Sequence, residues 1–373
     1  MTGGEPRAAT PLALKLAARI ARDGPIGIDD YMQACLQDPQ HGYYRRKPAI
    51  GSRGDFITAP EISQVFGEII GLWCVVVWQQ MGSPPALRLV ELGPGRGTLM
   101  RDALRAVRLV PAFCAALRVE LIESNAALEP IQRATLNGED VPIHWSRDLA
   151  AGTGPVIVIA NEFLDTLPIS QWVFRHGAWR RRCVDIDASG SLTFADRLAD
   201  AALPTPAGLA EPRDGDLYEE RGAALTPFAA QLASLGAPLA ALFIDYGHPH
   251  PGYGDTLQAV AAHRYADPLQ APGENDLTAQ VDFTAVAAAM RAGGLASDGP
   301  VGQAEFLGRL GIVERASKLM AANPAKAAQI EAGIARLIAP GGMGARFQAF
   351  GVRTREVAAL PAIQAMDTGA GAT

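Results

Sequence analysis

The chain has 373 residues, 49% hydrophobic and 19% charged, which suits one enlarged globular domain or two smaller ones. Its net charge of −6 argues against a duplex nucleic-acid partner, because contacts to phosphates need clustered Lys and Arg. No run of about 18 apolar residues is present, so we expect no membrane span.

The cysteines are widely separated and form neither a C-x-x-C pair nor a metal-binding spacing. They are Cys35, Cys74, Cys114 and Cys183. We therefore expect buried free thiols in a reducing compartment. The first residues lack a basic segment followed by an apolar run, so we expect no signal peptide.

The first clear helix is expected to open near Asp29, because breaker residues at 24–27 precede it and acidic residues suit a first turn. A loop rich in glycine and aromatic residues follows. Thr58 and Glu61 then have the spacing of a capping box, and apolar residues recur after them at helical intervals up to Gly82. This pattern predicts a long helix packed on a core.

From residue 86 onward, short apolar runs alternate with amphipathic segments. The expected strands are 87–92, 118–123, 141–145, 155–160 and 240–245, and the clearest helix among them is 98–110. Runs that are apolar throughout are typical of strands covered on both faces. The alternation predicts an α/β fold with a doubly wound, mostly parallel sheet of the Rossmann-like class.

Two segments interrupt this alternation. Residues 168–238 begin with a predicted hairpin that turns at His176-Gly177, and their remainder is rich in Ala, Pro and Gly and is not assigned. Residues 246–292 begin with a loop-like run that extends to 282. We interpret both segments as insertions after the fourth and fifth strands.

The expected domain organisation is an N-terminal helical region with a lid at 1–85 and a sheet domain at 86–373. Helices are expected to return at about 283–339, and 347–352 has the pattern of a closing strand. The two insertions belong to the sheet domain in this interpretation.

The glycine-rich run 93–97, Gly-Pro-Gly-Arg-Gly, lies between the first apolar strand and an amphipathic helix. Glycines at such a turn let a ligand approach the main chain, and the helix start offers free N–H groups. A dinucleotide would favour G-x-G-x-x-G with an acid about 20 residues further on. Here residue 98 is Thr, the next strand-end acid is Glu123, and Glu91 precedes the first glycine. S-adenosylmethionine therefore fits better than a dinucleotide.

In this interpretation Glu123 accepts both ribose hydroxyls, and Glu91 meets positive charge on the methionine part, directly or through water. Asp148 follows the third strand and could reach the adenine amino group or cap a helix; both interpretations stay open. The expected cofactor-binding residues are Glu91, Gly93, Pro94, Gly95, Gly97, Glu123, Asp148 and Asn161.

Polar residues follow the fourth strand directly, and ligands of open parallel sheets bind at such strand ends. A carboxylate placed after five apolar residues must be paired, solvated or functional. We expect Glu162, Asn161 and Asp165 to be the catalytic residues, although Asp165 could instead cap a helix. His248 and His250 lack a matching carboxylate, so no metal is expected.

Longer blocks distributed over residues 24–350 match one known family. They are GPI at 24–26, HGYY at 41–44, GSRGDFITAPEIS at 51–63, VELGPGRGTL at 90–99, ANEFLDTLP at 160–168, IDYGH at 244–248 and PGENDLTAQVDF at 272–283, with short matches at 302–303, 306–307 and 343–344. On these blocks the chain resembles the bacterial MidA and mitochondrial complex I assembly-factor family of protein arginine methyltransferases. It departs from that pattern at Ala59, where Ser is usual, and at 164–166, where Phe-Asp-Ala is usual.

The resemblance implies the seven-stranded methyltransferase fold with an N-terminal helical extension. It also implies symmetric dimethylation of an arginine on a subunit of respiratory complex I, the NADH:quinone oxidoreductase, in support of its assembly. The location would be the cytoplasm of a bacterium or the mitochondrial matrix of a eukaryote.

In that reaction Glu162 is expected to orient the charged guanidinium, with Asn161 hydrogen bonding beside it. Segment 41–63 could form a lid over the cofactor. The alternatives are a methyltransferase of another protein or of a small molecule, a nicotinamide oxidoreductase, and a non-catalytic assembly chaperone.

Overall fold

The computed structural model describes residues 9–46, 58–198, 208–261 and 264–363. Contacts divide the chain into two compact units. Unit 1 comprises Met1–Ala49, Thr166–Ala223 and Pro251–Ala279, and unit 2 comprises Ile50–Asp165, Ala224–His250 and Gln280–Thr373. The boundary expected at 85/86 does not separate these units, because helix α5 (Gln64–Gln80) packs on α6 (Thr98–Val107) within unit 2.

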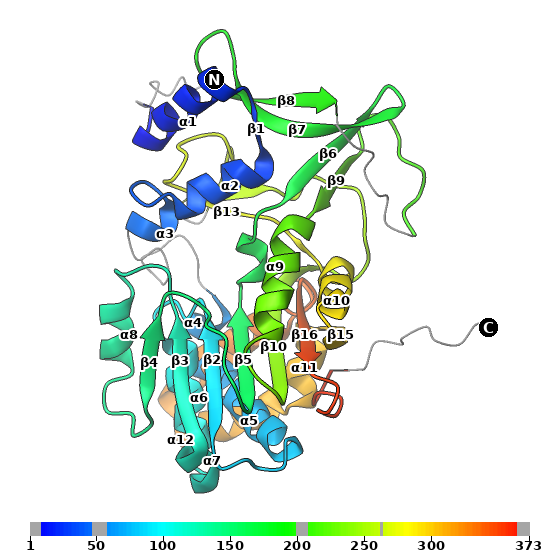
Figure 1. Cartoon of the computed structure of the whole chain (residues 1–373). Coiled ribbons are helices and arrows are strands. Elements are labelled where there is room, and N and C mark those ends of the chain that lie inside the picture. The colour runs from blue at the N-terminus through cyan, green and yellow to red at the C-terminus, as the bar shows by residue number, and fades with distance from the viewer. Residues whose placement is uncertain (1–8, 47–57, 199–207, 262–263, 364–373) are drawn as a thin grey trace, which may run out of the picture. The chain divides into compact units, whose positions relative to one another are not determined.

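Unit 2 is built on a sheet whose strands have the order β15-β16-β10-β5-β2-β3-β4 (Figure 1). Their bounds are β2 Leu87–Leu92, β3 Leu117–Ile122, β4 Ile143–Ser146, β5 Val156–Asn161, β10 Leu239–His248, β15 Ala296–Gly302 and β16 Phe347–Arg353. The strands from β4 to β10 are mutually parallel, whereas β16 is antiparallel to both of its neighbours. Short strand β14 (Val281–Asp282) also pairs with β10. This architecture confirms the predicted Rossmann-like, mostly parallel sheet.

Helices cover both faces of this sheet, with α5 and α6 behind it and α9 in front in the view of Figure 1. The other helices are α4 Ala59–Ile62, α7 Pro111–Ala116, α8 Glu129–Thr135, α9 Gly222–Ala233, α10 Phe283–Ala292, α11 Gln303–Arg309, α12 Ile312–Ala322 and α13 Ala327–Ile338, with 3₁₀ turns η1 Leu164–Thr166 and η2 Pro324–Lys326. Large side chains of α5, such as Phe66 and Trp73, are fully buried, so the removal of apolar surface from water holds this helix on the core.

Strand β15 was not predicted within the helical segment 283–339. Asp298, Gly299 and Pro300 resemble a turn in the sequence, but they form an irregularity in the pairing of β15 with β16. Arg353 donates to Asp298 at 2.9 Å, and this partner compensates the buried carboxylate.

Unit 1 contains helices and two small sheets. The helices are α1 Pro11–Asp23, α2 Ile28–Gln37 and α3 Tyr43–Arg46. One sheet contains β1 Ile26–Gly27, β6 Ser170–Arg175, β7 Ala178–Ile186, β8 Leu192–Leu198 and β9 Leu217–Glu220, and the other contains β11 Gln258–Ala261, β12 Arg264–Ala266 and β13 Asp276–Thr278. The hairpin predicted around His176 is formed by β6 and β7. The segments left unassigned or loop-like therefore contain strands whose pairing partners are distant in sequence.

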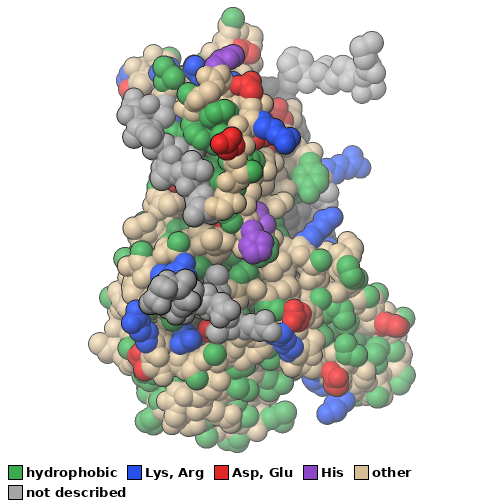
Figure 2. Space-filling view, turned by 90° about the vertical axis from the view of Figure 1, so that its right-hand side faces the viewer, with side chains coloured by type: hydrophobic (Ala, Val, Ile, Leu, Met, Phe, Trp, Pro, Cys, Tyr) green, Lys and Arg blue, Asp and Glu red, His purple; other side chains and the backbone are tan. Residues whose placement is uncertain are grey.

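Cys35, Cys74 and Cys183 are buried and Cys114 is half-buried, and all four are free thiols. No described helix has the length and apolarity that crossing a membrane requires. Within the described ranges, no group of three or more His, Cys, Asp and Glu side chains is arranged to hold a metal ion. On the face drawn in Figure 2, acidic and basic side chains of the described residues are interspersed.

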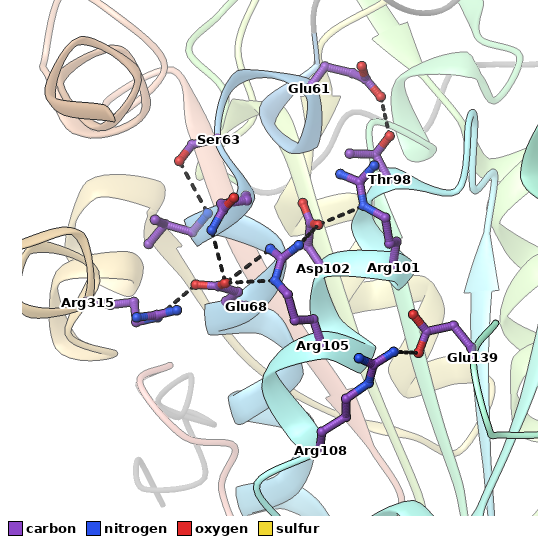
Figure 3. Close-up of polar contacts among 12 residues, drawn as sticks. Glu61, Ser63, Glu68, Thr98, Arg101, Asp102, Arg105, Arg108, Glu139 and Arg315 are labelled. Carbon is purple, nitrogen blue, oxygen red and sulfur yellow. Dashed lines mark hydrogen bonds and ion pairs between the residues drawn. The ribbon is translucent and has the colours of Figure 1, made fainter. Parts of the chain in front are cut away.

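A buried ion-pair network joins helices α5, α6 and α12 (Figure 3). Glu68 of α5 is 1% exposed, and its carboxylate lies 3.1 Å from Arg105 of α6 and 2.7 Å from Arg315 of α12. Breaking such a pair would leave an uncompensated buried charge. The network therefore holds α6, the helix that follows the glycine-rich run, against α5.

The predicted capping box at Thr58 and Glu61 is wrong. Ser63 has an extended backbone that separates α4 from α5, and its Oγ accepts from the N–H of Val65 at 3.3 Å. The side chain of Glu61 instead accepts a hydrogen bond from the Thr98 hydroxyl. Thr58 is the N-cap residue of α4, but its side chain makes no capping hydrogen bond, so the reciprocal pair of a capping box is absent.

Candidate active site

The glycine loop, residues 93–97, joins β2 to α6 at the carboxyl end of the sheet. The N–H of Gly93 donates to the Ile122 carbonyl at 3.1 Å, and that of Gly97 donates to the Pro94 carbonyl at 2.8 Å. Gly93, Gly95 and Gly97 have φ values of +62°, +55° and +79°. L side chains rarely adopt such values, so the course of this loop requires glycine at all three positions.

Glu91 lies one residue before the end of β2 and is only 2% exposed. Its Oε2 has no hydrogen-bond partner among the described residues. Burial, and then the nearby charge of Glu123, raise the pKa of Glu91 to about 8. A buried acceptor without a donor is unfavourable unless a ligand supplies one, and the ammonium group of S-adenosylmethionine is such a donor. The geometry fits the predicted role of Glu91.

Glu123 follows β3 and is held by its own neighbourhood. Its Oε1 accepts from the N–H of Asn125 at 2.7 Å, and its Oε2 accepts from Nε2 of Gln132 at 3.1 Å. Gln132 also donates to the carbonyl of Gly95 at 2.8 Å and accepts from Nε1 of Trp145 at 3.1 Å.

Gln132 lies on α8 and is fully buried. One amide therefore fixes the glycine loop, the acid expected to bind ribose, and strand β4. The sequence does not reveal the role of Gln132, because a glutamine in a helix is ordinarily exposed.

Asp148 lies beyond β4 and is exposed. Its N–H donates to the Ser146 hydroxyl at 3.2 Å. Residues 147–155 are all described and contain no helix, so the interpretation of Asp148 as a helix cap is wrong. Its contact with adenine stays a prediction.

Asn161 ends β5, where its neighbour Ala160 pairs with Leu92 of β2. Its Nδ2 donates to Oε1 of Glu162 at 3.1 Å, and its buried Oδ1 finds no partner within the described part of the chain. Glu162 has φ +53°, a backbone conformation that costs a non-glycine residue roughly 1–2 kcal/mol. Strain of this kind is typical of functional sites.

Opposing contacts act on the Glu162 carboxyl group. Burial, and then repulsion from Asp165, raise its pKa to about 8. Hydrogen bonds from Asn161 and from the N–H of Ala59, together with the charge of Arg336, favour the ionised form. A cation bound at Glu162 would favour that form further.

Asp245 of β10 organises the turn that carries the predicted catalytic residues. Its Oδ2 accepts from the N–H groups of Phe163, Leu164 and Asp165 at 3.0, 2.8 and 3.2 Å. Burial, and then repulsion from Asp165, raise the pKa of Asp245 well above its ordinary value. Asp165 is itself buried and accepts from the Tyr246 hydroxyl at 2.6 Å. Asp245, and not Asp165, therefore caps the 3₁₀ turn.

Most of the predicted site residues thus gather at the carboxyl ends of β2, β3 and β5. Glu91, the glycine loop and Glu123 are called the cofactor half, after the role predicted for them, and they present acceptor atoms and bare main chain. The carboxyl groups of Glu162, Asp165 and Asp245 are called the acceptor half, after the cationic acceptor predicted to bind there. This arrangement can place a methyl donor beside a cationic acceptor.

Residues 69–301 match the model of a family described as "Putative S-adenosyl-L-methionine-dependent methyltransferase". The chain is 36% identical over 380 residues to Protein arginine methyltransferase NDUFAF7, mitochondrial, from Mus musculus, with 94% of this chain and 86% of that protein covered. The Drosophila melanogaster homolog is 36% identical over 373 residues, which cover 90% and 83% of the two chains. A COG1565 superfamily crystal structure from Burkholderia thailandensis, bound to S-adenosyl-homocysteine, matches with a TM-score of 0.85 at 28% identity and covers 94% of each chain.

Proposed function

Because this chain belongs to the S-adenosylmethionine-dependent methyltransferase family, we propose that it methylates an arginine on a subunit of respiratory complex I and supports assembly of that complex. The relatives above are named protein arginine methyltransferases. In this chain, the proposal is carried by three carboxyl groups, those of Glu162, Asp165 and Asp245, gathered around one turn. Buried like charges destabilise one another, and a cationic acceptor would relieve that repulsion.

We assign the cofactor half of the site to S-adenosylmethionine, which when bound supplies an electrophilic methyl group on a sulfonium. Glu123 would accept the ribose hydroxyls, and Asp148 would reach the adenine amino group. Glu91 Oε2 and Asn161 Oδ1, both buried acceptors, would receive the ammonium protons. The glycine loop would let the ligand contact the main chain.

Glu162 would hold the acceptor, since a guanidinium stays charged at neutral pH. Charge-assisted hydrogen bonds from the guanidinium to Glu162 would orient one nitrogen toward the methyl group. As that nitrogen gains the methyl group it loses one proton, and a carboxylate with a pKa of about 8 can accept it. Asn161, whose Nδ2 donates to Oε1 of Glu162, would keep that carboxylate in place.

The proposal includes two successive transfers that give symmetric dimethylarginine. It also includes the compartment where complex I subunits are accessible, namely the bacterial cytoplasm or the mitochondrial matrix. The mouse relative is named mitochondrial.

The direct test incubates the protein with methyl-labelled S-adenosylmethionine and purified complex I subunits. We expect intact-mass spectra to show two added methyl groups on one subunit, and fragment spectra to place one on each terminal nitrogen of an arginine. Glu162→Gln serves as the inactive control. Label on another residue type, or on no protein, would contradict the proposal.

A further inference from the structure

Helix α4, Ala59–Ile62, contacts both halves of the candidate site, although none of its residues was predicted to be catalytic or cofactor-binding. It belongs to the segment 41–63 expected as a lid, of which residues 47–57 lie outside the described residues. The N–H of Ala59 donates to the Glu162 carboxylate. Oε1 of Glu61 accepts from the Thr98 hydroxyl at 2.5 Å (Figure 3). Thr98 is the first residue of α6 and directly follows Gly97 of the glycine loop. Two residues of one helical turn thus bind the acceptor half and the cofactor half.

The turn itself is tightly held. Ala59 is fully buried, and the N–H of Glu61 donates to the Thr58 carbonyl at 2.9 Å. Gly333 of α13 approaches so closely that a Cβ at this position would lie 3.2 Å from the Ile62 carbonyl oxygen. A four-residue helix is not stable alone, so these tertiary contacts decide its position. Ala59 and Glu61 must therefore move together.

We infer that Glu61 is a positioning residue for methyl transfer, because its hydrogen bond to Thr98 sets α4 against the start of α6 and so lets Ala59 fix the Glu162 carboxylate. The inference deepens the proposed function, since it rests on Glu162 as the residue that orients the acceptor. It predicts that loss of the bond to Thr98 disturbs Glu162, although Glu61 itself touches neither reactant.

The effect has a defined sign. An N–H that donates to a carboxylate favours the ionised form, so weakening the bond from Ala59 must raise the pKa of Glu162 above about 8. The charged groups that face Glu162 from its other neighbours are Asp165, Asp245 and Arg336. None of them belongs to α4. Arg336 lies on α13, which packs against α4, and its movement away from Glu162 would also raise this pKa, so an upward shift reports on α4 and the helix packed on it.

The experiment compares Glu61→Ala and Thr98→Val with Glu61→Gln and Thr98→Ser, which keep an acceptor and a hydroxyl. Infrared difference spectra of the carboxyl band are titrated with pH, and the Glu162 signal is assigned by subtraction of Glu162→Gln. We expect an upward pKa shift in the first pair and wild-type values in the second pair. This readout needs neither turnover nor substrate.

Methyl transfer gives the second readout. We expect kcat to fall about 10- to 100-fold in Glu61→Ala and in Thr98→Val, because small misplacements of a reacting group have effects of that size. The KM for S-adenosylmethionine should change little. The double variant should be no slower than either single variant, since both remove the same interaction.

Glu139→Ala is the matched control, because it breaks a 2.9 Å ion pair with Arg108 at the far end of α6 (Figure 3). It should leave the Glu162 titration and kcat unchanged. An unshifted titration in a folded Glu61→Ala or Thr98→Val protein overturns the inference; either variant alone suffices if the other misfolds. A shifted titration in a protein that methylates no arginine would instead overturn the proposed function and leave the positioning role intact.

Discussion

The cofactor half and the acceptor half of the site are assembled in different ways. Glu91, the glycine loop and Glu123, which define the cofactor half, come from one continuous stretch, residues 87–135, in which β2, the glycine loop, α6, β3 and α8 succeed one another. The acceptor half collects Ala59, the turn at 161–165, Asp245 and Arg336 from distant parts of the chain. Contiguous sequence can specify the first half, whereas the second exists only in the folded protein.

The electrostatics of the two halves differ as well. The cofactor half presents a buried acceptor that lacks a donor, Glu91 Oε2. The acceptor half contains carboxyl groups that repel one another, together with the strained backbone of Glu162. A ligand stabilises the first half by supplying a donor and the second by supplying a positive charge. Substitutions in the first half should therefore alter binding, and substitutions in the second should alter turnover.

The sharpest test of this division is Glu162→Gln. We expect kcat to fall about 100- to 1,000-fold, because the neutral amide neither orients a guanidinium as strongly nor accepts its proton. Calorimetry should show nearly unchanged affinity for S-adenosyl-homocysteine. A collapse of that affinity would move Glu162 into the cofactor half.

Gly93→Val should produce the opposite result, namely a loss of affinity for the cofactor. Its φ of +62° disfavours a branched side chain, and the added atoms occupy the space through which a ligand approaches the main chain. We expect S-adenosyl-homocysteine to bind about 100-fold more weakly, a difference of about 2.7 kcal/mol. Gly138→Val is the control, since Gly138 has φ +84° and no described atom within 4 Å of an added Cβ. Equal losses in both variants would mean that backbone strain, and not the site, is responsible.

Gln132→Leu tests whether one buried amide supports the cofactor half. The change removes the side-chain amide that the Gly95 carbonyl, the Glu123 carboxylate and Nε1 of Trp145 share as a hydrogen-bond partner. We expect the affinity for S-adenosyl-homocysteine to fall about 10- to 30-fold, since each unsatisfied buried group costs about 1–3 kcal/mol and part of that loss falls on stability.

Gln303→Leu is the matched control for this variant. Gln303 is also fully buried, and it donates to the Leu337 carbonyl at 2.8 Å. It should lower the melting temperature without changing cofactor affinity. If both variants bind the cofactor equally well, Gln132 has no special role.

Glu91→Gln should give the smallest change in binding, a loss of about fivefold, because a neutral acceptor replaces a charged one. Although the substitution weakens cofactor binding, it should stabilise the folded protein at high pH. The pKa of Glu91 rises from 4.5 to about 8 on folding, so within this window only the folded state keeps the proton, and stability falls as pH rises. Glutamine does not titrate, so Glu91→Gln removes this dependence of stability on pH.

We expect Glu91→Gln to melt roughly 2–4 °C higher than the wild type at pH 8. The advantage should shrink as pH falls toward 4.5 and vanish below it, where both states of the wild type hold the proton. Thermal scans across this pH range check the sign. Glu305→Gln, an exposed partner of Arg309, should show no such trend. A constant difference at every pH would contradict the assigned burial of charge.

Local patterns accounted for much of the fold. The apolar run at 87–92 predicted β2 with its observed bounds, and the alternation after it predicted the parallel sheet. Strand β15 escaped notice because its Asp298-Gly299-Pro300 segment looks like a turn until β16 pairs beside it. The capping box failed for a similar reason, since only packing against α6 shows that Glu61 faces Thr98.

What the sequence by itself determined is the parallel part of the sheet, its glycine loop and the acids at the strand ends, because periodicity and backbone freedom are properties of neighbouring residues. Only the tertiary structure decided how those acids behave. The raised pKa of Glu162, its contact with Ala59, the turn held by Asp245 and the amide of Gln132 all depend on burial and on partners far away in the chain. Burial sets the free energy of a charge, and burial is created by folding.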